Sequence, residues 1–249
     1  MKSLKTKMLI LVLLPLAALI LNAQDQAYWI HEDQVNLSKT DEYEQVTKDF
    51  IQACKKHNLQ NADWKTAYME DGVYLSITPI NKMADFDSNP LAPLAEKMGE
   101  DKFKALFKRF DQCYDTHGDY IMFYNEALSY MPIGRIAGEN YRKWHYFHVT
   151  PSKSKAFAEK LIAIKAIYVN KNAKESYRIY HSGFGVMGEY YVASISAKDE
   201  ESYLKTSDNA ETLFGDKDKL MFMQLLELTH KYEKKSGAIR HDLSYSTKL

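Results

Sequence analysis

The order of predicted elements repeats once along this sequence, and the repeat constrains the fold more than any single motif. The stretch from Trp144 to Val149 has the side-chain alternation of a strand and starts a second copy of what precedes it. Each copy is predicted to run strand, helix, strand, strand, helix, strand. In the first copy these elements are 27–33, 40–56, 63–70, 73–80, 103–117 and 121–130. In the second copy they are 144–149, 152–170, 176–182, 189–197, 217–235 and 238–246.

Short matching segments accompany the repeated order. Leu128-Ser129-Tyr130 recurs as Leu243-Ser244-Tyr245 at an offset of 115, and Ala95-Glu96 recurs as Ala210-Glu211 at the same offset. Ile30-His31 aligns with Phe147-His148 at an offset of 117. Their consistent order favours a tandem repeat over chance. This alignment relates His31 to His148, and aligning Asp63-Trp64-Lys65 with Ser176-Tyr177-Arg178 relates Lys65 to Arg178.

The repeated element order, from about Tyr28 to Ser246, resembles the dimeric α+β barrel superfamily. Its members include antibiotic-biosynthesis-type monooxygenases and, in tandem form, haem proteins such as chlorite dismutase. The resemblance implies an α+β fold: two tandem ferredoxin-like βαββαβ units whose antiparallel sheets pack as a pseudo-dimeric barrel. The expected units are 24–132 and 144–249, joined by a linker at 133–143. No residue motif places the chain in a specific family, so no catalytic residue can be transferred.

The N-terminus has the features of a secretory signal peptide. Lys2, Lys5 and Lys7 precede an apolar run from Met8 to Leu21, and the small-residue site ends at Ala23. We therefore expect residues 1–23 to be removed and the protein to be exported, to the periplasm or beyond. The apolar run is shorter than the roughly 20 residues that span a bilayer, and no later run approaches that length, so the exported protein should not be a membrane protein.

Charge argues against nucleic acid as a partner. The full chain has 33 basic and 33 acidic residues, and removal of the three N-terminal lysines leaves the mature part weakly acidic. The remaining partners to expect are a small molecule and, if the protein is not a monomer, a second copy of the chain.

The two cysteines are predicted to fall near the ends of two neighbouring helices. Cys54 lies close to the end of the first helix and Cys113 close to the expected end of the second. In a ferredoxin-like unit these helices lie side by side, so a Cys54–Cys113 disulfide is geometrically plausible in an exported protein. Two buried free thiols are the alternative.

A ligand pocket is expected beside the two founding strands of the copies. Trp144, Tyr146 and His148 should share one face of the second strand, with His145 on the other. Superfamily members bind apolar or aromatic ligands beside such a sheet, oriented by a few polar groups. A packed aromatic core without a pocket is the alternative. The predicted ligand-binding residues are Trp29, His31, Lys65, Trp144, Tyr146, His148 and Arg178.

These observations favour an exported protein that binds a small apolar or aromatic ligand. One alternative is an enzyme, either a cofactor-free monooxygenase or isomerase or a haem-dependent enzyme, with His31, His148 or His145 as base or axial ligand. The other is an interaction scaffold without a pocket. The glycine motif at 183–188 precedes a strand, unlike a dinucleotide fingerprint, which precedes a helix. Neither catalytic residues nor metal ligands are predicted.

Overall fold

The structure is a computed structural model that describes residues 25–134 and 136–247. The predicted signal peptide lies outside the described residues. The first copy consists of β1 (Gln26–Val35), η2 (Leu37–Lys39), α2 (Thr40–Lys56), β2 (Asp63–Met69), β3 (Val73–Ile80), η3 (Met83–Asp87), α3 (Ala92–Met98), α4 (Glu100–Phe110) and β4 (Tyr114–Tyr130). The second consists of β5 (Tyr141–Val149), α5 (Pro151–Asn170), β6 (Tyr177–Ser182), β7 (Glu189–Ala197), α6 (Glu200–Leu213), α7 (Asp216–Glu227) and β8 (Thr229–Ser246).

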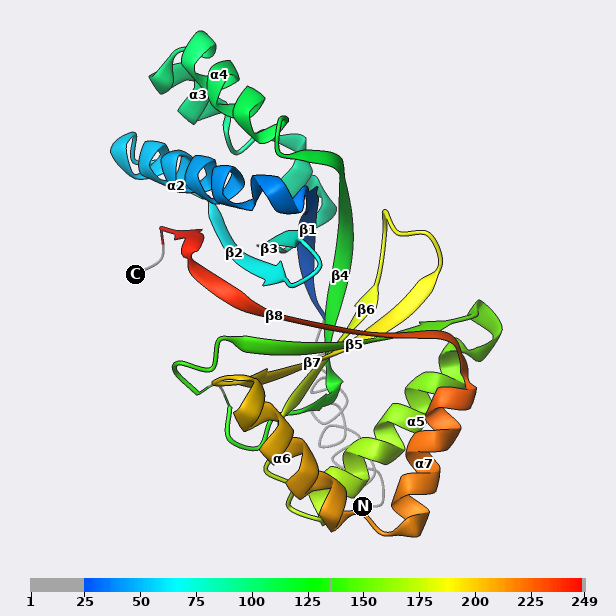
Figure 1. Cartoon of the computed structure of the whole chain (residues 1–249). Helices are drawn as coiled ribbons and strands as arrows, with labels where there is room; N and C mark the ends of the chain where they lie inside the picture. Colours follow the sequence, from blue (N-terminus) through cyan, green and yellow to red (C-terminus); the bar gives the residue numbers. More distant parts are fainter. Residues whose placement is uncertain (1–24, 135, 248–249) are drawn as a thin grey trace, which may run out of the picture.

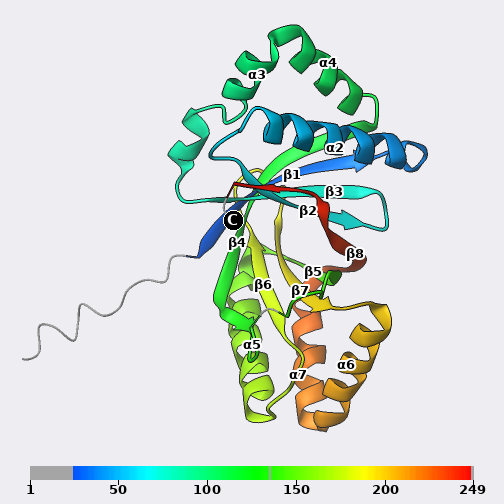
Figure 2. The same cartoon turned by 90° about the vertical axis from the view of Figure 1, so that its left-hand side faces the viewer.

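The eight strands form one closed antiparallel barrel in the order β1-β3-β2-β8-β5-β7-β6-β4 (Figure 1). Within each copy, four strands pair as a ferredoxin-like sheet. Between the copies, β2 pairs with β8 and β4 pairs with β6. The helices of the first copy cover one side of the barrel and those of the second cover the opposite side (Figure 2). The predicted fold class is therefore confirmed.

The two long strands β4 and β8 repeat each other in detail. Oγ of Ser129 donates to the carbonyl of Asn125 and accepts the amide of Ile179, at 2.6 and 2.8 Å. Oγ of Ser244 makes the same pair of bonds, to the carbonyl of Arg240 and from the amide of Thr66, at 2.7 and 2.9 Å. Each serine thus satisfies the backbone at an irregularity in the strand pairing between copies. The two serines are 115 residues apart, so the offset found in the sequence relates structurally equivalent residues of β4 and β8.

The founding strands β1 and β5 match in a different register from the one predicted. His31 pairs across the ladder with Asp119, and His145 pairs with Lys234, which is 115 residues after Asp119. The structural equivalent of His31 is therefore His145. The predicted equivalence of His31 and His148 is wrong by three residues, and an odd shift along a strand moves a side chain to the opposite face.

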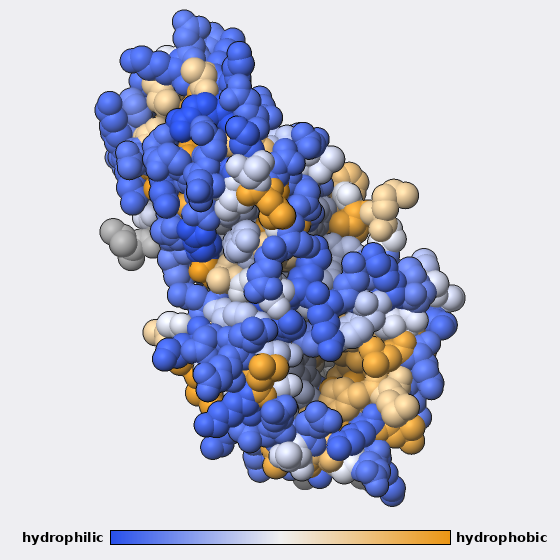
Figure 3. Space-filling view, in the orientation of Figure 1, coloured by the Kyte–Doolittle hydropathy of each residue, from blue (hydrophilic) through white to orange (hydrophobic). Residues whose placement is uncertain are grey.

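Buried side chains form an apolar cluster inside the barrel and further clusters between the sheets and their helices. The cluster inside the barrel includes Ile30, Leu75, Trp144 and Val192. Outside it, Phe147 packs with Phe157 and Leu161 of α5. Charged side chains cover much of the helical surface, and apolar side chains are exposed where α5 and α7 lie (Figure 3). Within the described residues no helix is long and apolar enough to cross a membrane.

The predicted ends of two helices were wrong, and one helix was missed. Helix α4 ends at Phe110, so β4 begins seven residues before its predicted start at 121. Helix α7 ends at Glu227, and the charged segment that follows it belongs to β8. That segment carries three lysines and Glu233, which a helix accepts, but pairing with β5 holds it as a strand. Helix α6 was not predicted.

Cys54 and Cys113 are free, buried thiols in the structure, and the predicted disulfide is not formed. Cys113 lies beyond the end of α4, in the turn before β4, rather than in the last turn of a helix. Its Sγ contacts the carbonyl of Arg109 at 3.3 Å. Cys54 packs in a separate cluster with Ile51 and Leu59. The helix geometry on which the disulfide prediction depended is therefore absent.

Candidate functional site

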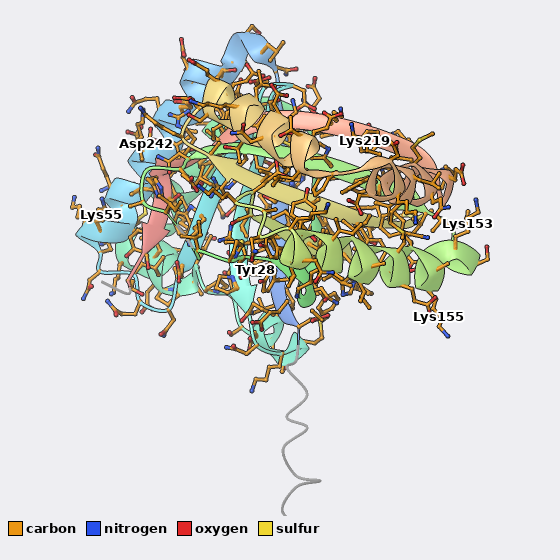
Figure 4. The ribbon with its side chains drawn as sticks, turned by 90° about the horizontal axis from the view of Figure 1, so that it is seen from below. Tyr28, Lys55, Lys153, Lys155, Lys219 and Asp242 are labelled. Atoms are coloured by element: carbon orange, nitrogen blue, oxygen red, sulfur yellow. The ribbon has the colours of Figure 1, made fainter. Side chains whose placement is uncertain are left out.

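The barrel encloses a cavity of about 880 Å³. Its wall is formed by inward-facing side chains of the strands, among them Tyr28 and Ile30 of β1, Trp144 and Tyr146 of β5, and Tyr190 and Val192 of β7. Tyr28 lies near the middle of the molecule seen from below, whereas Lys155 points outward from α5 (Figure 4). The loop after β4 contributes Ile133, Gly134 and residues 136–140 to the lining.

Four of the seven predicted binding residues line this cavity: Lys65, Trp144, Tyr146 and Arg178. Trp29 and His31 do not, because Tyr28 and Ile30 face inward and alternate residues of a strand face opposite sides. His148 shares a face with Tyr146 but lies outside the lining, where its Nε2 bonds to Glu233 at 2.8 Å.

The two cations in the wall occupy equivalent positions in the copies. Trp64 pairs with Tyr245 of β8, and Tyr177 pairs with Tyr130 of β4, so the residues that follow, Lys65 and Arg178, are related by the pseudo-twofold axis. Arg178 also donates from Nη1 to Oγ of Ser196 at 3.4 Å. The cavity therefore combines aromatic walls with positive charge contributed by both copies.

Tyrosine hydroxyls supply neutral donors in the same wall. Tyr120 donates to a carboxylate oxygen of Glu32 at 2.7 Å. Burial raises the pKa of Tyr120 and Tyr146 far above the ordinary value, and that of Tyr190 to about 12. These phenols remain protonated at neutral pH, so they can donate hydrogen bonds but do not act as bases.

Glu175 is a cavity residue that the sequence did not indicate. It is almost fully buried, and its Oε2 accepts a hydrogen bond from the hydroxyl of Tyr168 at 2.8 Å. Its Oε1 has no hydrogen-bond partner among the described residues. Burial raises the pKa of this carboxyl. A lone glutamate between Lys174 and Ser176 carries no motif, so only the three-dimensional arrangement identifies it.

The equivalent histidines of the two copies lie in opposite electrostatic surroundings on the outer face of the barrel. Asp33 and Asp119 raise the pKa of His31 to about 9. Burial lowers the pKa of His145 to about 4, with a smaller contribution from Lys234 and Lys143. Part of the difference comes from one exchange of residues, since Lys234 occupies in the second copy the position that Asp119 holds in the first.

The three histidines considered as haem ligands do not fit an axial role in this cavity. None of them lines it. The ring nitrogens of His31 contact Asp33 and Asp119, and those of His145 contact Tyr232 and Tyr203. His148 is bonded to Glu233. We therefore derive no chemistry through haem.

No protein-family model matches the chain. No curated protein matches it either. Among solved structures, an anthrone oxidase-like protein is similar over 91% of this chain and 95% of its own, with a TM-score of 0.60 and 10% identity. A proposed monooxygenase from Lactobacillus acidophilus is similar over 87% and 94%, with a TM-score of 0.53 and 7% identity. A mutant chlorite dismutase from Candidatus Nitrospira defluvii is similar over 87% and 92%, with a TM-score of 0.51 and 8% identity. These similarities support the dimeric α+β barrel fold in its fused form.

We expect the environment of His145 to make stability depend on pH. Because its pKa is about 4 in the folded protein and 6.5 ordinarily, the unfolded chain takes up a proton between these values that the folded protein does not. This contribution to stability is therefore lost as pH falls from about 6.5 to 4. H145Q should lose less stability than the wild type between pH 7 and 4.5, by about 1–2 kcal/mol. Urea unfolding of both proteins at the two pH values measures this difference. An equal loss of unfolding free energy in H145Q and the wild type would contradict the prediction.

Proposed function

We propose that this protein binds a small, largely apolar or aromatic molecule carrying an anionic group, in the cavity of its fused barrel. The observation that supports the proposal is the cavity of about 880 Å³ inside the barrel, within the usual range for drug-sized ligands. Trp144, Tyr146 and Tyr190 provide apolar area, whose removal from water contributes about 25 cal/mol per Å². Lys65 and Arg178 provide the attraction for a negative group.

Two matched fluorescent probes test the chemistry of this cavity. 1-Anilinonaphthalene-8-sulfonate has fused aromatic rings and a sulfonate, and N-phenyl-1-naphthylamine is its neutral counterpart. Both should bind the native protein saturably at one site. R178Q should weaken binding of the sulfonate probe by about tenfold, as expected for loss of a charge-assisted contact, and leave the neutral probe unchanged.

Filling the cavity provides the second arm of this experiment. V192W, on the cavity wall, should abolish binding of both probes, whereas L220W, on the exposed surface of α7, should not. Thermal unfolding confirms that each variant is folded. Undiminished binding by folded V192W, or no saturable binding by the wild type, would contradict the proposal.

Export is the second part of the proposed function, based on the basic and apolar character of residues 1–23. Protein recovered from its own host should begin at Gln24, as measured by intact mass and N-terminal sequencing. Recovery of a chain that retains residues 1–23 would contradict cleavage at this site. Export and ligand binding can fail independently.

Catalysis on an aromatic ligand is a second candidate function, favoured by Glu175. A buried carboxylate with a raised pKa on a cavity wall is a stronger base than an exposed one and is suited to accept a proton. The structural neighbours described as an anthrone oxidase-like protein and a monooxygenase suggest which substrate to test first.

We expect the protein to accelerate the oxidation of anthrone by O₂ to anthraquinone and water if this candidate is correct. E175Q should lower the rate by about 10²-fold or more while both fluorescent probes still bind. E159Q, on the exposed surface of α5, is the matched control and should keep the wild-type rate. Oxygen uptake measured with an electrode shows whether the protein catalyses this oxidation. A wild-type rate equal to the uncatalysed rate, or an unchanged rate in E175Q, would exclude this role for Glu175 on anthrone.

A further inference from the structure

Two His-x-Asp segments face each other on the outer surface of the first copy. His31 and Asp33 belong to β1, and His117 and Asp119 belong to β4. In the antiparallel ladder His31 pairs directly with Asp119, and Asp33 pairs directly with His117. The four side chains therefore form a compact quadrilateral on one face. The ligand atoms of His31, Asp33 and His117 all lie within 4.8 Å of one another.

The separation of two of these atoms suits a small metal ion. Nε2 of His31 and Oδ1 of Asp33 are 3.3 Å apart. Ligand atoms of a tetrahedral site with bonds of about 2.0 Å are themselves about 3.3 Å apart. His117 is exposed, so its ring can rotate to bring a nitrogen to the same ion.

The two carboxylate oxygens of Asp33 have different surroundings, and one of them faces the position proposed for the ion. Asp33 is only 4% exposed, and its Oδ2 accepts a hydrogen bond from the hydroxyl of Tyr43 at 2.6 Å. Its Oδ1 lies 3.3 Å from Nε2 of His31 and makes no hydrogen bond to any other group among the described residues. A buried carboxylate oxygen is costly without a cation beside it; the imidazolium of His31 fills that role here, and a metal ion bound between the two residues would replace its proton.

Asp119 and Trp29 orient the imidazole of His31. Nδ1 of His31 lies 2.9 Å from Oδ1 of Asp119, which also accepts a hydrogen bond from Nε1 of Trp29 at 2.8 Å. A carboxylate on one ring nitrogen, with the other nitrogen directed at the ion, is the usual support of a metal-bound histidine. With Nδ1 held by Asp119, Nε2 of His31 is the nitrogen that binds the ion once its proton is released.

The second copy shows that the barrel does not require these residues. The positions equivalent to His31, Asp33, His117 and Asp119 hold His145, Phe147, Tyr232 and Lys234. There, Phe147 stacks on Tyr232, and Nδ1 of His145 bonds to the hydroxyl of Tyr232 at 2.6 Å. The same place in the fold is thus filled by an aromatic cluster, and only the first copy has the complete set of ligands.

We propose that His31, Asp33 and His117 bind a divalent transition-metal ion on the outer face of β1 and β4, with Asp119 as a positioning residue. Two imidazoles and one carboxylate suit Zn²⁺, Co²⁺, Ni²⁺ or Fe²⁺ rather than Ca²⁺ or Mg²⁺, which prefer oxygen ligands alone. Exposure of His117 leaves at least one coordination position open to water or another ligand. The site lies on the opposite face of the sheet from the barrel cavity, so it is independent of the proposed ligand binding.

Calorimetric titration with Co²⁺ and Zn²⁺ tests this site, on protein purified without a histidine tag. We expect one ion of either metal per chain, with Co²⁺ giving a visible absorption spectrum. H117A should weaken affinity by at least tenfold, and D119N by about tenfold or more. H230A, an exposed histidine on a strand of the second copy, is the matched control and should bind as the wild type does.

Mg²⁺ should not compete with Co²⁺ at equal concentration. Thermal unfolding without metal shows whether each variant is folded, and the exposed positions of His117 and Asp119 make both substitutions mild. The proposal is overturned if the wild type shows no saturable binding of one ion. It is equally overturned if folded H117A and D119N bind as tightly as the wild type, or if H230A weakens binding to the same degree.

Discussion

The pairing of strands between the two copies is the interaction on which the rest of this structure depends. Each ferredoxin-like sheet ends in strands that need a partner, and β2 with β8 and β4 with β6 supply it. Closure removes exposed sheet edges and turns the inner faces of both sheets toward one interior. The cavity is a consequence of that closure, because the inward side chains leave about 880 Å³ unfilled. Ser129 and Ser244 secure the junctions with equivalent hydrogen bonds.

Within this symmetric frame, the copies have diverged most clearly on the outer face. Asp33 and Asp119 surround His31 in the first copy, and Phe147 and Lys234 surround His145 in the second. The two carboxylates raise the pKa of His31, whereas burial, with a smaller contribution from Lys234 and Lys143, lowers the pKa of His145. Inside the barrel the copies remain closer, since Lys65 and Arg178 conserve a positive charge at equivalent positions. Symmetry is therefore kept where the copies meet and relaxed where each faces outward.

The sequence predicted the architecture well because hydrophobic periodicity and segment matches are local signals. Strands β3 and β7 were predicted with the bounds they have, and the match of Leu128–Tyr130 to Leu243–Tyr245 identified the repeat. The alignment of β1 with β5 could not be obtained in this way, because two strands rich in aromatic residues and histidine match at more than one offset, and the predicted offset was wrong by three residues. Because this shift is an odd number of residues, it misplaced Trp29 and His31 in the cavity. The pairing of Lys65 with Arg178 was correct because the sequence around them fixed the register.

Interactions between segments far apart in the sequence account for the other features that were predicted wrongly or missed. The helix predicted over 217–235 extended into residues that pairing with β5 holds as a strand. Assigning His117 to a helix separated it from Asp33 and hid the two facing His-x-Asp segments. Glu175 joins the cavity through the closure of the barrel, which no local pattern reports. Candidate sites in this protein are thus properties of strand register, and register is the part of the fold that the sequence alone defines least.

Hydrogen–deuterium exchange measured by mass spectrometry tests the closed barrel most directly. If closure depends on pairing between the copies, then β2, β4, β6 and β8 should be protected to a similar degree and exchange through one cooperative opening. Mild denaturant should expose the strands of both copies together. Exchange of β5–β8 while β1–β4 remain protected, or the reverse, would show that the copies are independent domains and would contradict the account.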